Sequence, residues 1–205
     1  YKTAFNNALK TFEKMGYKTK LGQNCYAGDG IGISNTPLKC AKEINSFLCG
    51  EYNEEISALF SCGGGELMCE ILDDVDFDKI KKSKPVWFLG YSDNTNLTFL
   101  LPTICDITAI YSPCAPAYGM EPWHPSLKDT FELLTGKSNM AHGYDKWEKE
   151  SVKNEENPLV PYNVTKKTEI KKFGAGKDDA KTEISGRLIG GCLDCLSNLA
   201  GTKFD

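Results

Sequence analysis

The chain has 205 residues, of which 40% are hydrophobic and 25% are charged, and its formal net charge is -4. This composition suits one or two globular domains, argues against nucleic acid or an anionic membrane as partner, and contains no apolar run near the roughly 20 residues that span a bilayer. The nine cysteines are odd in number and irregularly spaced, so we expect reduced, mostly buried thiols in a cytoplasmic protein rather than a disulfide framework.

The first two thirds of the chain alternate between helical and strand patterns. In order, the sequence predicts a helix at 1–15, a strand at 17–21, a glycine-rich loop at 24–36, a helix at 37–48, a buried strand at 56–61, a helix at 66–72, a helical turn at 76–81, a strand at 86–89, a helix at 94–101, a strand at 107–111 and a helix at 125–134. This alternation predicts an α/β fold in which helices flank a mainly parallel sheet, a flavodoxin-like domain over 1–135. Ligands of such sheets bind beyond the carboxyl ends of the strands.

The rest of the chain changes character. Residues 136–181 are polar and charged, which indicates a connector with short strands such as 167–173. Residues 182–205 then predict the incomplete start of a C-terminal domain, with a helix at 193–199. Cys192 and Cys195 have C-x-x-C spacing but lack a second ligand pair, so we expect neither a metal site nor a cofactor.

Ser92 follows the apolar stretch 86–89 by a short turn through Gly90, and a helix is predicted directly after it. A strand–turn–helix elbow of this kind exposes a serine hydroxyl at a helix N-terminus, where negative charge is favoured. It is typical of acyl-transfer enzymes. The alternative is an ordinary helix N-cap, since Gly-Tyr-Ser-Asp differs from the familiar Gly-x-Ser-x-Gly.

Three consecutive glycines, 63–65, follow the strand predicted at 56–61. Glycine runs mark positive φ angles or close backbone approaches. No Lys-Ser or Lys-Thr follows, which excludes a P-loop, and the dinucleotide-binding G-x-G-x-x-G pattern is absent. An oxyanion hole and a tight strand–helix turn therefore remain as alternatives.

Together these loops resemble a known family. The segments CGGGE at 62–66, LDDVDF at 72–77 and FLGYSDNT at 88–95 are similar to the LD-carboxypeptidase family of serine peptidases, which includes the microcin C immunity peptidases. Further similar segments are FEKMGY at 12–17, YSP at 111–113 and GRLIGGCL at 186–193. The resemblance implies a Ser-His-Glu triad with Ser92 as nucleophile. It also implies an oxyanion hole formed by the N–H of Asp93 and that of Gly65, or of Gly64.

The sequence also departs from the family pattern. The family's catalytic Glu and His lie downstream of its GRLIGG motif, and this sequence ends at Asp205. We therefore expect an internal portion of a longer protein that lacks both residues and the family's first strand, and that has little or no peptidase activity. His124, at a helix start, and His142, in the connector, do not match the family's histidine.

Smaller departures concern the substrate. Cys192 stands where many members have Asn, at a position expected to face the substrate, and Ser112 replaces a usual glycine. Gly64 is also expected to bind the substrate. Trp147 is either a substrate-stacking aromatic, as in the immunity branch, or a partly packed surface residue.

Three functions follow as hypotheses. The first is hydrolysis of the bond to a terminal D-amino acid in a cytoplasmic muropeptide, a small peptide substrate, as in peptidoglycan recycling. The second is an immunity-type peptidase that cleaves aminoacyl or peptidyl nucleotide antibiotics. The third is a non-catalytic module that binds a small anion at 63–65. The resemblance also allows a homodimer.

Overall fold

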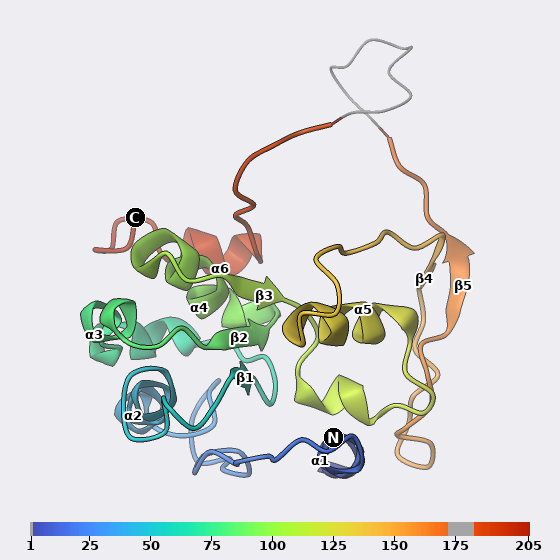
Figure 1. The fold of residues 1–205 in the computed structure, drawn as a ribbon, viewed down its shortest axis with the longest axis horizontal. Helices are drawn as coiled ribbons and strands as arrows, with labels where there is room; N and C mark the ends of the chain where they lie inside the picture. Colours follow the sequence, from blue (N-terminus) through green and yellow to red (C-terminus); the bar gives the residue numbers. More distant parts are fainter. Residues whose placement is uncertain (1, 172–182) are drawn as a thin grey trace.

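The computed structural model describes residues 2–171 and 183–205. Its centre is a parallel sheet in the order β1–β2–β3, formed by β1 (Ala58–Phe60), β2 (Trp87–Gly90) and β3 (Ala109–Tyr111). In this register Leu59 pairs with Phe88, and Leu89 pairs with Ile110. The carboxyl ends of all three strands therefore lie at one edge, which confirms the predicted α/β fold with a mainly parallel sheet (Figure 1).

Helices flank this sheet, with α2 and α3 on one side of it in Figure 1 and α1 and α5 on the other. The α-helices are α1 (Lys2–Lys14), α2 (Pro37–Leu48), α3 (Phe77–Lys82), α4 (Thr95–Leu100), α5 (Pro125–Leu134) and α6 (Leu193–Ser197). Tighter 3-10 turns form η1 (Met68–Asp74), η2 (Ser92–Asn94) and η4 (Ala115–Gly119), and η3 (Leu101–Cys105) is a π-helical turn. The bounds of α2 and α5 are those that the sequence predicts. After α1, Gly16 takes the positive φ, +89°, that favours glycine at a helix end.

Two apolar clusters hold these layers together. In the larger one, Phe88 of β2 and Leu97 of α4 are buried with Ile80 of α3 and residues of α2 and η1. In the smaller one, Phe12 of α1 stacks on Phe131 of α5, with ring centroids 5.9 Å apart, beside the aromatic residue of η4. The smaller cluster fixes α1 and α5 to the segment that follows β3.

The strand predicted at 17–21 is wrong. These residues run as an irregular segment that lines the same cavity as β1. Among the described residues β1 pairs with β2 alone, so its other edge stays open and 17–21 form no ladder with it. A short polar-apolar alternation is a weak local signal, and tertiary contacts decide whether it pairs as a strand.

Other boundaries differ by local geometry. The helix predicted at 66–72 is the 3-10 turn η1, which begins two residues later, and the strand predicted at 56–61 shortens to the half-buried β1. In the connector, β4 (Lys146–Glu148) and β5 (Val164–Lys167) form an antiparallel pair. The strand predicted at 167–173 is therefore wrong. The observed strand β5 ends at Lys167, where the predicted strand begins, and residues 168–171 are irregular. Residues 172–173 lie outside the described residues.

Near the C-terminus, residues 183–192 are irregular and lead into α6, which is shorter than the predicted helix at 193–199. Leu199 is nevertheless buried in the larger cluster, so this last segment packs on the sheet domain. Within 2–171 and 183–205, none of the helices has the length and apolar character needed to cross a bilayer.

The core assignment can be tested with one leucine pair. Leu97 is 0% exposed and Leu38, on α2, is 50% exposed. We expect Leu97→Ala to lower the free energy of unfolding by about 2–5 kcal/mol, because it removes buried methyl groups and leaves a cavity. Leu38→Ala, the matched control, should change it by less than about 1 kcal/mol. Urea titration followed by circular dichroism measures both, and equal losses would contradict the packing described.

Candidate active site

Ser92 begins the turn that links β2 to α4, and its backbone is strained. Its φ is +60°, a left-handed value that costs a residue with a side chain about 1–2 kcal/mol. Tyr91 before it is extended, with φ -139° and ψ 179°. The N–H of Ser92 donates to the hydroxyl oxygen of Tyr111, at the end of β3, over 3.0 Å. The sharp reversal after β2 is thus held by the neighbouring strand, as the predicted elbow requires.

The glycine loop, Gly63–Gly65, lies against this turn. A Cβ atom built on Gly64 would lie 3.4 Å from Cβ and 3.5 Å from Oγ of Ser92, so a side chain at position 64 would contact the serine side chain. A Cβ atom on Gly65 would come within 2.4 Å of the Gly32 carbonyl oxygen and 2.8 Å of Oδ2 of Asp93. The loop therefore needs glycine at position 65 because neighbours crowd it on two sides.

Backbone N–H groups are available beside the serine. Asp93 is the second residue of η2, and the first N–H groups of a helix have no partner within it. Within the described residues, the N–H groups of Gly64 and Gly65 also make no hydrogen bond. Such free donors next to a nucleophile are what an oxyanion hole uses.

Asn94 ties the glycine loop to the serine turn. Its Nδ2 donates to the Gly63 carbonyl oxygen over 2.8 Å and to the Tyr91 carbonyl oxygen over 3.0 Å. A Cβ on Gly90 would lie 2.6 Å from Cγ of Asn94, so glycine at the strand end makes room for this amide. Sequence reasoning missed both Asn94 and Tyr111. The one signal for Tyr111 is that it ends the strand predicted at 107–111, although the sequence does not show that this strand pairs with β2.

The Asp93 carboxylate is buried and hydrogen-bonded within the protein. It is 4% exposed, its Oδ2 accepts the Met68 N–H over 2.9 Å, and its Oδ1 accepts Nδ2 of Asn96 over 3.2 Å. Burial raises the pKa of this carboxyl, and the bond from Met68 partly offsets that rise. The side chain anchors the turn to η1, which leaves the backbone N–H for a ligand.

The segment after Gly190 also reaches the turn. The N–H of Cys192 donates to Oγ1 of Thr95 over 2.9 Å, and a Cβ on Gly191 would lie 2.4 Å from Cγ2 of Thr95. Sγ of Cys195 donates to the Ser92 carbonyl oxygen over 3.5 Å. The structure therefore places Cys192 against Thr95 at the start of α4, whereas Gly64 and Asp93, with Gly65 beside them, lie next to Ser92 itself.

Trp147 is not joined to this group. It lies in β4 opposite Lys166 and is 49% exposed. In the part of the chain that the structure describes, it makes no aromatic contact or hydrogen bond with the serine turn. Its role toward a substrate stays a prediction.

Both histidines are engaged elsewhere. His124 caps α5, where its Nδ1 accepts the Ser126 N–H over 3.2 Å. His142 is exposed, and its Nδ1 lies 3.1 Å from Oδ2 of Asp129. Neither makes a hydrogen bond to Ser92, and the described residues contain no cluster of three or more groups suited to a metal ion.

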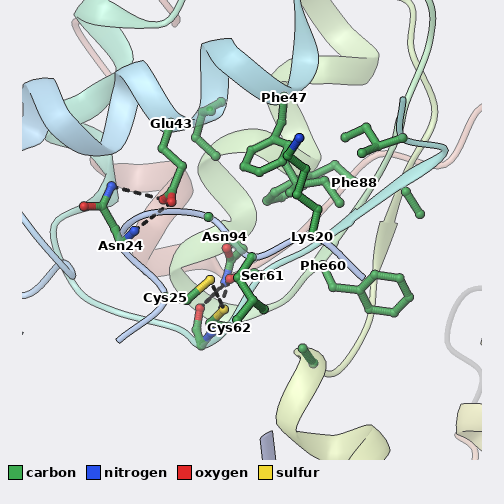
Figure 2. Close-up of a pocket in the computed structure, with 18 of the residues that line it drawn as sticks. Lys20, Asn24, Cys25, Glu43, Phe47, Phe60, Ser61, Cys62, Phe88 and Asn94 are labelled. Atoms are coloured by element: carbon green, nitrogen blue, oxygen red, sulfur yellow. Dashed lines mark hydrogen bonds between the residues drawn. The ribbon is translucent and has the colours of Figure 1, made fainter. Parts of the chain in front are cut away.

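A cavity of about 870 Å³ opens beside the glycine loop, between α1, α2 and β1 (Figure 2). On its wall the Glu43 carboxylate accepts the backbone N–H of Asn24 over 2.8 Å and its Nδ2 over 3.1 Å. This pair holds the segment 22–27 in place. Asn94 and Asp93 reach the same cavity, so it borders the serine turn.

Comparisons with known proteins agree with this geometry. Residues 1–112 match the peptidase S66 family, described as the LD-carboxypeptidase N-terminal domain. No curated protein sequence matches the chain. The microcin C7 self immunity protein MccF in its wild-type apo state superposes with a TM-score of 0.80 at 26% identity, over 99% of this chain and 59% of that one.

Two further solved structures extend the comparison. MccF in complex with aspartyl sulfamoyl adenosine gives a TM-score of 0.79 at 26% identity, again over 99% and 59% of the two chains. An MccF-like protein from Streptococcus pneumoniae in complex with AMP gives 0.70 at 16% identity, over 98% and 58%, a likeness of fold alone. The chain thus spans about 59% of the length of MccF.

The strain at Ser92 can be measured with two substitutions that both remove the hydroxyl. We expect Ser92→Gly to unfold with a free energy about 1 kcal/mol higher than Ser92→Ala, because glycine adopts φ +60° without the Cβ penalty. Urea unfolding of both variants provides the comparison. A Ser92→Ala variant as stable as Ser92→Gly would show that the turn is unstrained.

The crowding at Gly65 gives a second test. We expect Gly65→Ala to lower the free energy of unfolding by about 1–3 kcal/mol, since the new methyl group would overlap Gly32 and Asp93. Gly28→Ala is the matched control, because a Cβ there meets nothing within 4 Å. Thermal unfolding by circular dichroism distinguishes them, and similar melting temperatures would refute the close approach.

Proposed function

Because the chain belongs to the LD-carboxypeptidase family, we propose that it carries the nucleophile of a serine-type peptidase and that Ser92 is this nucleophile. The observation that supports this most directly is the strained strand–helix turn at Ser92 with Gly64 close to its side chain. A helix cap needs neither the left-handed backbone nor a glycine loop beside the hydroxyl.

In this proposal Ser92 Oγ attacks the carbonyl carbon of the scissile amide. The negative charge that develops on the carbonyl oxygen is stabilised by the N–H of Asp93 and that of Gly65, or of Gly64. Collapse of the tetrahedral intermediate releases the amine of the terminal residue and leaves an acyl group on Ser92, which water then hydrolyses. A base must take the Ser92 proton and pass it to the leaving amine. By resemblance to the family, this base is a histidine paired with a glutamate in the C-terminal domain.

The proposed substrate is an LD-peptide bond at the end of a muropeptide in the cytoplasm, as in peptidoglycan recycling, and the proposed assembly is a homodimer. The family description supports this substrate class. Cys192 and Gly64 would contact the substrate, since both lie beside the serine turn. A thiol at position 192 offers a weaker hydrogen-bond donor than the amide that many members have there.

A second candidate is an immunity-type peptidase that cleaves an aminoacyl or peptidyl nucleotide conjugate. Its support is the likeness to MccF over 99% of this chain, including a complex with aspartyl sulfamoyl adenosine. In this reading Trp147, half exposed on β4, would stack on the base of the nucleotide.

One experiment separates these functions. We expect the full-length protein to cleave either an LD-tetrapeptide or aspartyl sulfamoyl adenosine, and Ser92→Ala to lower kcat by about 10³-fold or more. Ser151→Ala, at an exposed connector serine, serves as the matched control with unchanged activity. Tight binding of a small anion that survives Ser92→Ala, without cleavage or labelling of Ser92 by a fluorophosphonate, would favour the non-catalytic module instead.

Residues 1–205 alone provide a further check. The described residues place no histidine against Ser92, and a serine hydroxyl without a base is a poor nucleophile. We therefore expect the purified chain to hydrolyse neither substrate above background in a mass-spectrometric assay. Turnover by residues 1–205 that disappears in Ser92→Ala would show that this chain supplies its own base.

A further inference from the structure

Two cysteines that the proposed reaction does not use face each other beside the glycine loop. Sγ of Cys25 and Sγ of Cys62 lie 3.5 Å apart, and Figure 2 shows the two sulfur atoms side by side. Cys62 immediately precedes Gly63, while Cys25 lies in the turn that follows Gly22, far away in sequence. Both are half-buried, and both line the cavity of about 870 Å³.

The surroundings of this pair differ from those of the buried thiol of Cys105. Cys25 and Cys62 sit in irregular segments, whereas Cys105 ends a helical turn and donates its thiol hydrogen to the Phe77 carbonyl oxygen over 3.4 Å. A disulfide requires an S–S distance of about 2.05 Å, so its formation here needs a closure of about 1.5 Å. Segments outside helices and strands absorb such a movement most easily.

The two thiols also differ in acidity. The Cys62 thiol donates a hydrogen bond to Sγ of Cys25, which lowers the pKa of Cys25. The same bond, together with burial, raises the pKa of Cys62. The thiolate is the reactive form of cysteine, so Cys25 is the member of the pair that is ready to attack.

We propose that Cys25 and Cys62 form a reversible disulfide by exchange with a small-molecule disulfide such as oxidised glutathione. The Cys25 thiolate attacks one sulfur of oxidised glutathione, a glutathione thiolate leaves, and a mixed disulfide forms on Cys25. Cys62 loses its proton to solvent, attacks the Cys25 sulfur and expels the second glutathione thiolate. Two protein thiols are oxidised while one disulfide is reduced to two thiols, and the cavity provides the route of access.

The cross-link would act on the glycine loop. The Gly63 carbonyl oxygen already accepts from Nδ2 of Asn94 over 2.8 Å and from Oγ of Ser61 over 2.7 Å. A disulfide bond from the adjacent Cys62 to Cys25 would tie this loop to the segment 24–36. That segment already contacts the residue directly after the loop, because the Glu66 N–H donates to the Gly32 carbonyl oxygen. Oxidation thus restrains the backbone that borders Ser92. Only the effect on catalysis rests on the proposed function; the disulfide chemistry does not.

The disulfide can be mapped directly. Purified residues 1–205 are equilibrated with mixtures of reduced and oxidised glutathione, alkylated in acid and digested for mass spectrometry. We expect a peptide pair linked through Cys25 and Cys62 as the main oxidised product, and we expect dithiothreitol to reverse it. Cys25→Ser and Cys62→Ser should lose the product, whereas Cys105→Ser, the matched control, should retain it. Absence of the linked pair in every mixture, a lasting glutathione adduct on Cys25, or linkage to another cysteine would overturn the proposal.

A second measurement keeps the result independent of how the variants fold and of whether Ser92 is catalytic. In the wild-type chain, hydrogen exchange at the amides of Gly63 and Glu66, which donate to Oγ of Ser61 and to the Gly32 carbonyl oxygen, should slow by about fivefold or more on oxidation, because the cross-link restricts local opening. The same amides in Cys25→Ser should be insensitive to glutathione. Equal exchange rates in oxidised and reduced wild-type protein would refute the restraint of the glycine loop.

Discussion

The side chain of Asn94 joins two segments that the chain brings from different strands. Its amide bonds the Gly63 carbonyl oxygen after β1 and the Tyr91 carbonyl oxygen after β2, over 2.8 and 3.0 Å. Around it, Gly65 and Gly90 have no room for a side chain, because the neighbouring atoms occupy that space. The proposed nucleophile, the free N–H donors and the segment around Cys192 all depend on this contact, since each is positioned by the glycine loop or by the turn.

The fold and the proximity of the two loops could be predicted from sequence because they follow from general rules. Alternating helices and strands indicate a parallel sheet, and parallel strands bring their carboxyl ends to one edge. The helix end near Gly16 and the helix start at Pro37 could be predicted for the same reason, since glycine adopts the positive φ of a helix end and proline fixes the φ of a first helical residue. Such features need no knowledge of distant contacts.

The features that the sequence did not predict depend on contacts between residues far apart in the chain. Among the described residues, 17–21 do not pair with the open edge of β1, and no local pattern reveals that. Tyr111 accepts from the Ser92 N–H because the register places it opposite Gly90, which the sequence does not encode locally. The left-handed φ at Ser92 is imposed by the same neighbours, so it could not be read from the segment 90–94.

The parallel pairing of β1, β2 and β3 has a consequence for the order of folding. Each pairing joins segments separated by a helix-containing crossover, and contacts of this kind form slowly because a loop must close before they contribute. The turn at Ser92 is bonded by groups that follow β1 and β3, so it acquires its strained shape only after both strands have docked on β2. We therefore expect the strained shape of this turn to be among the last features of the domain to form, after the sheet that holds it.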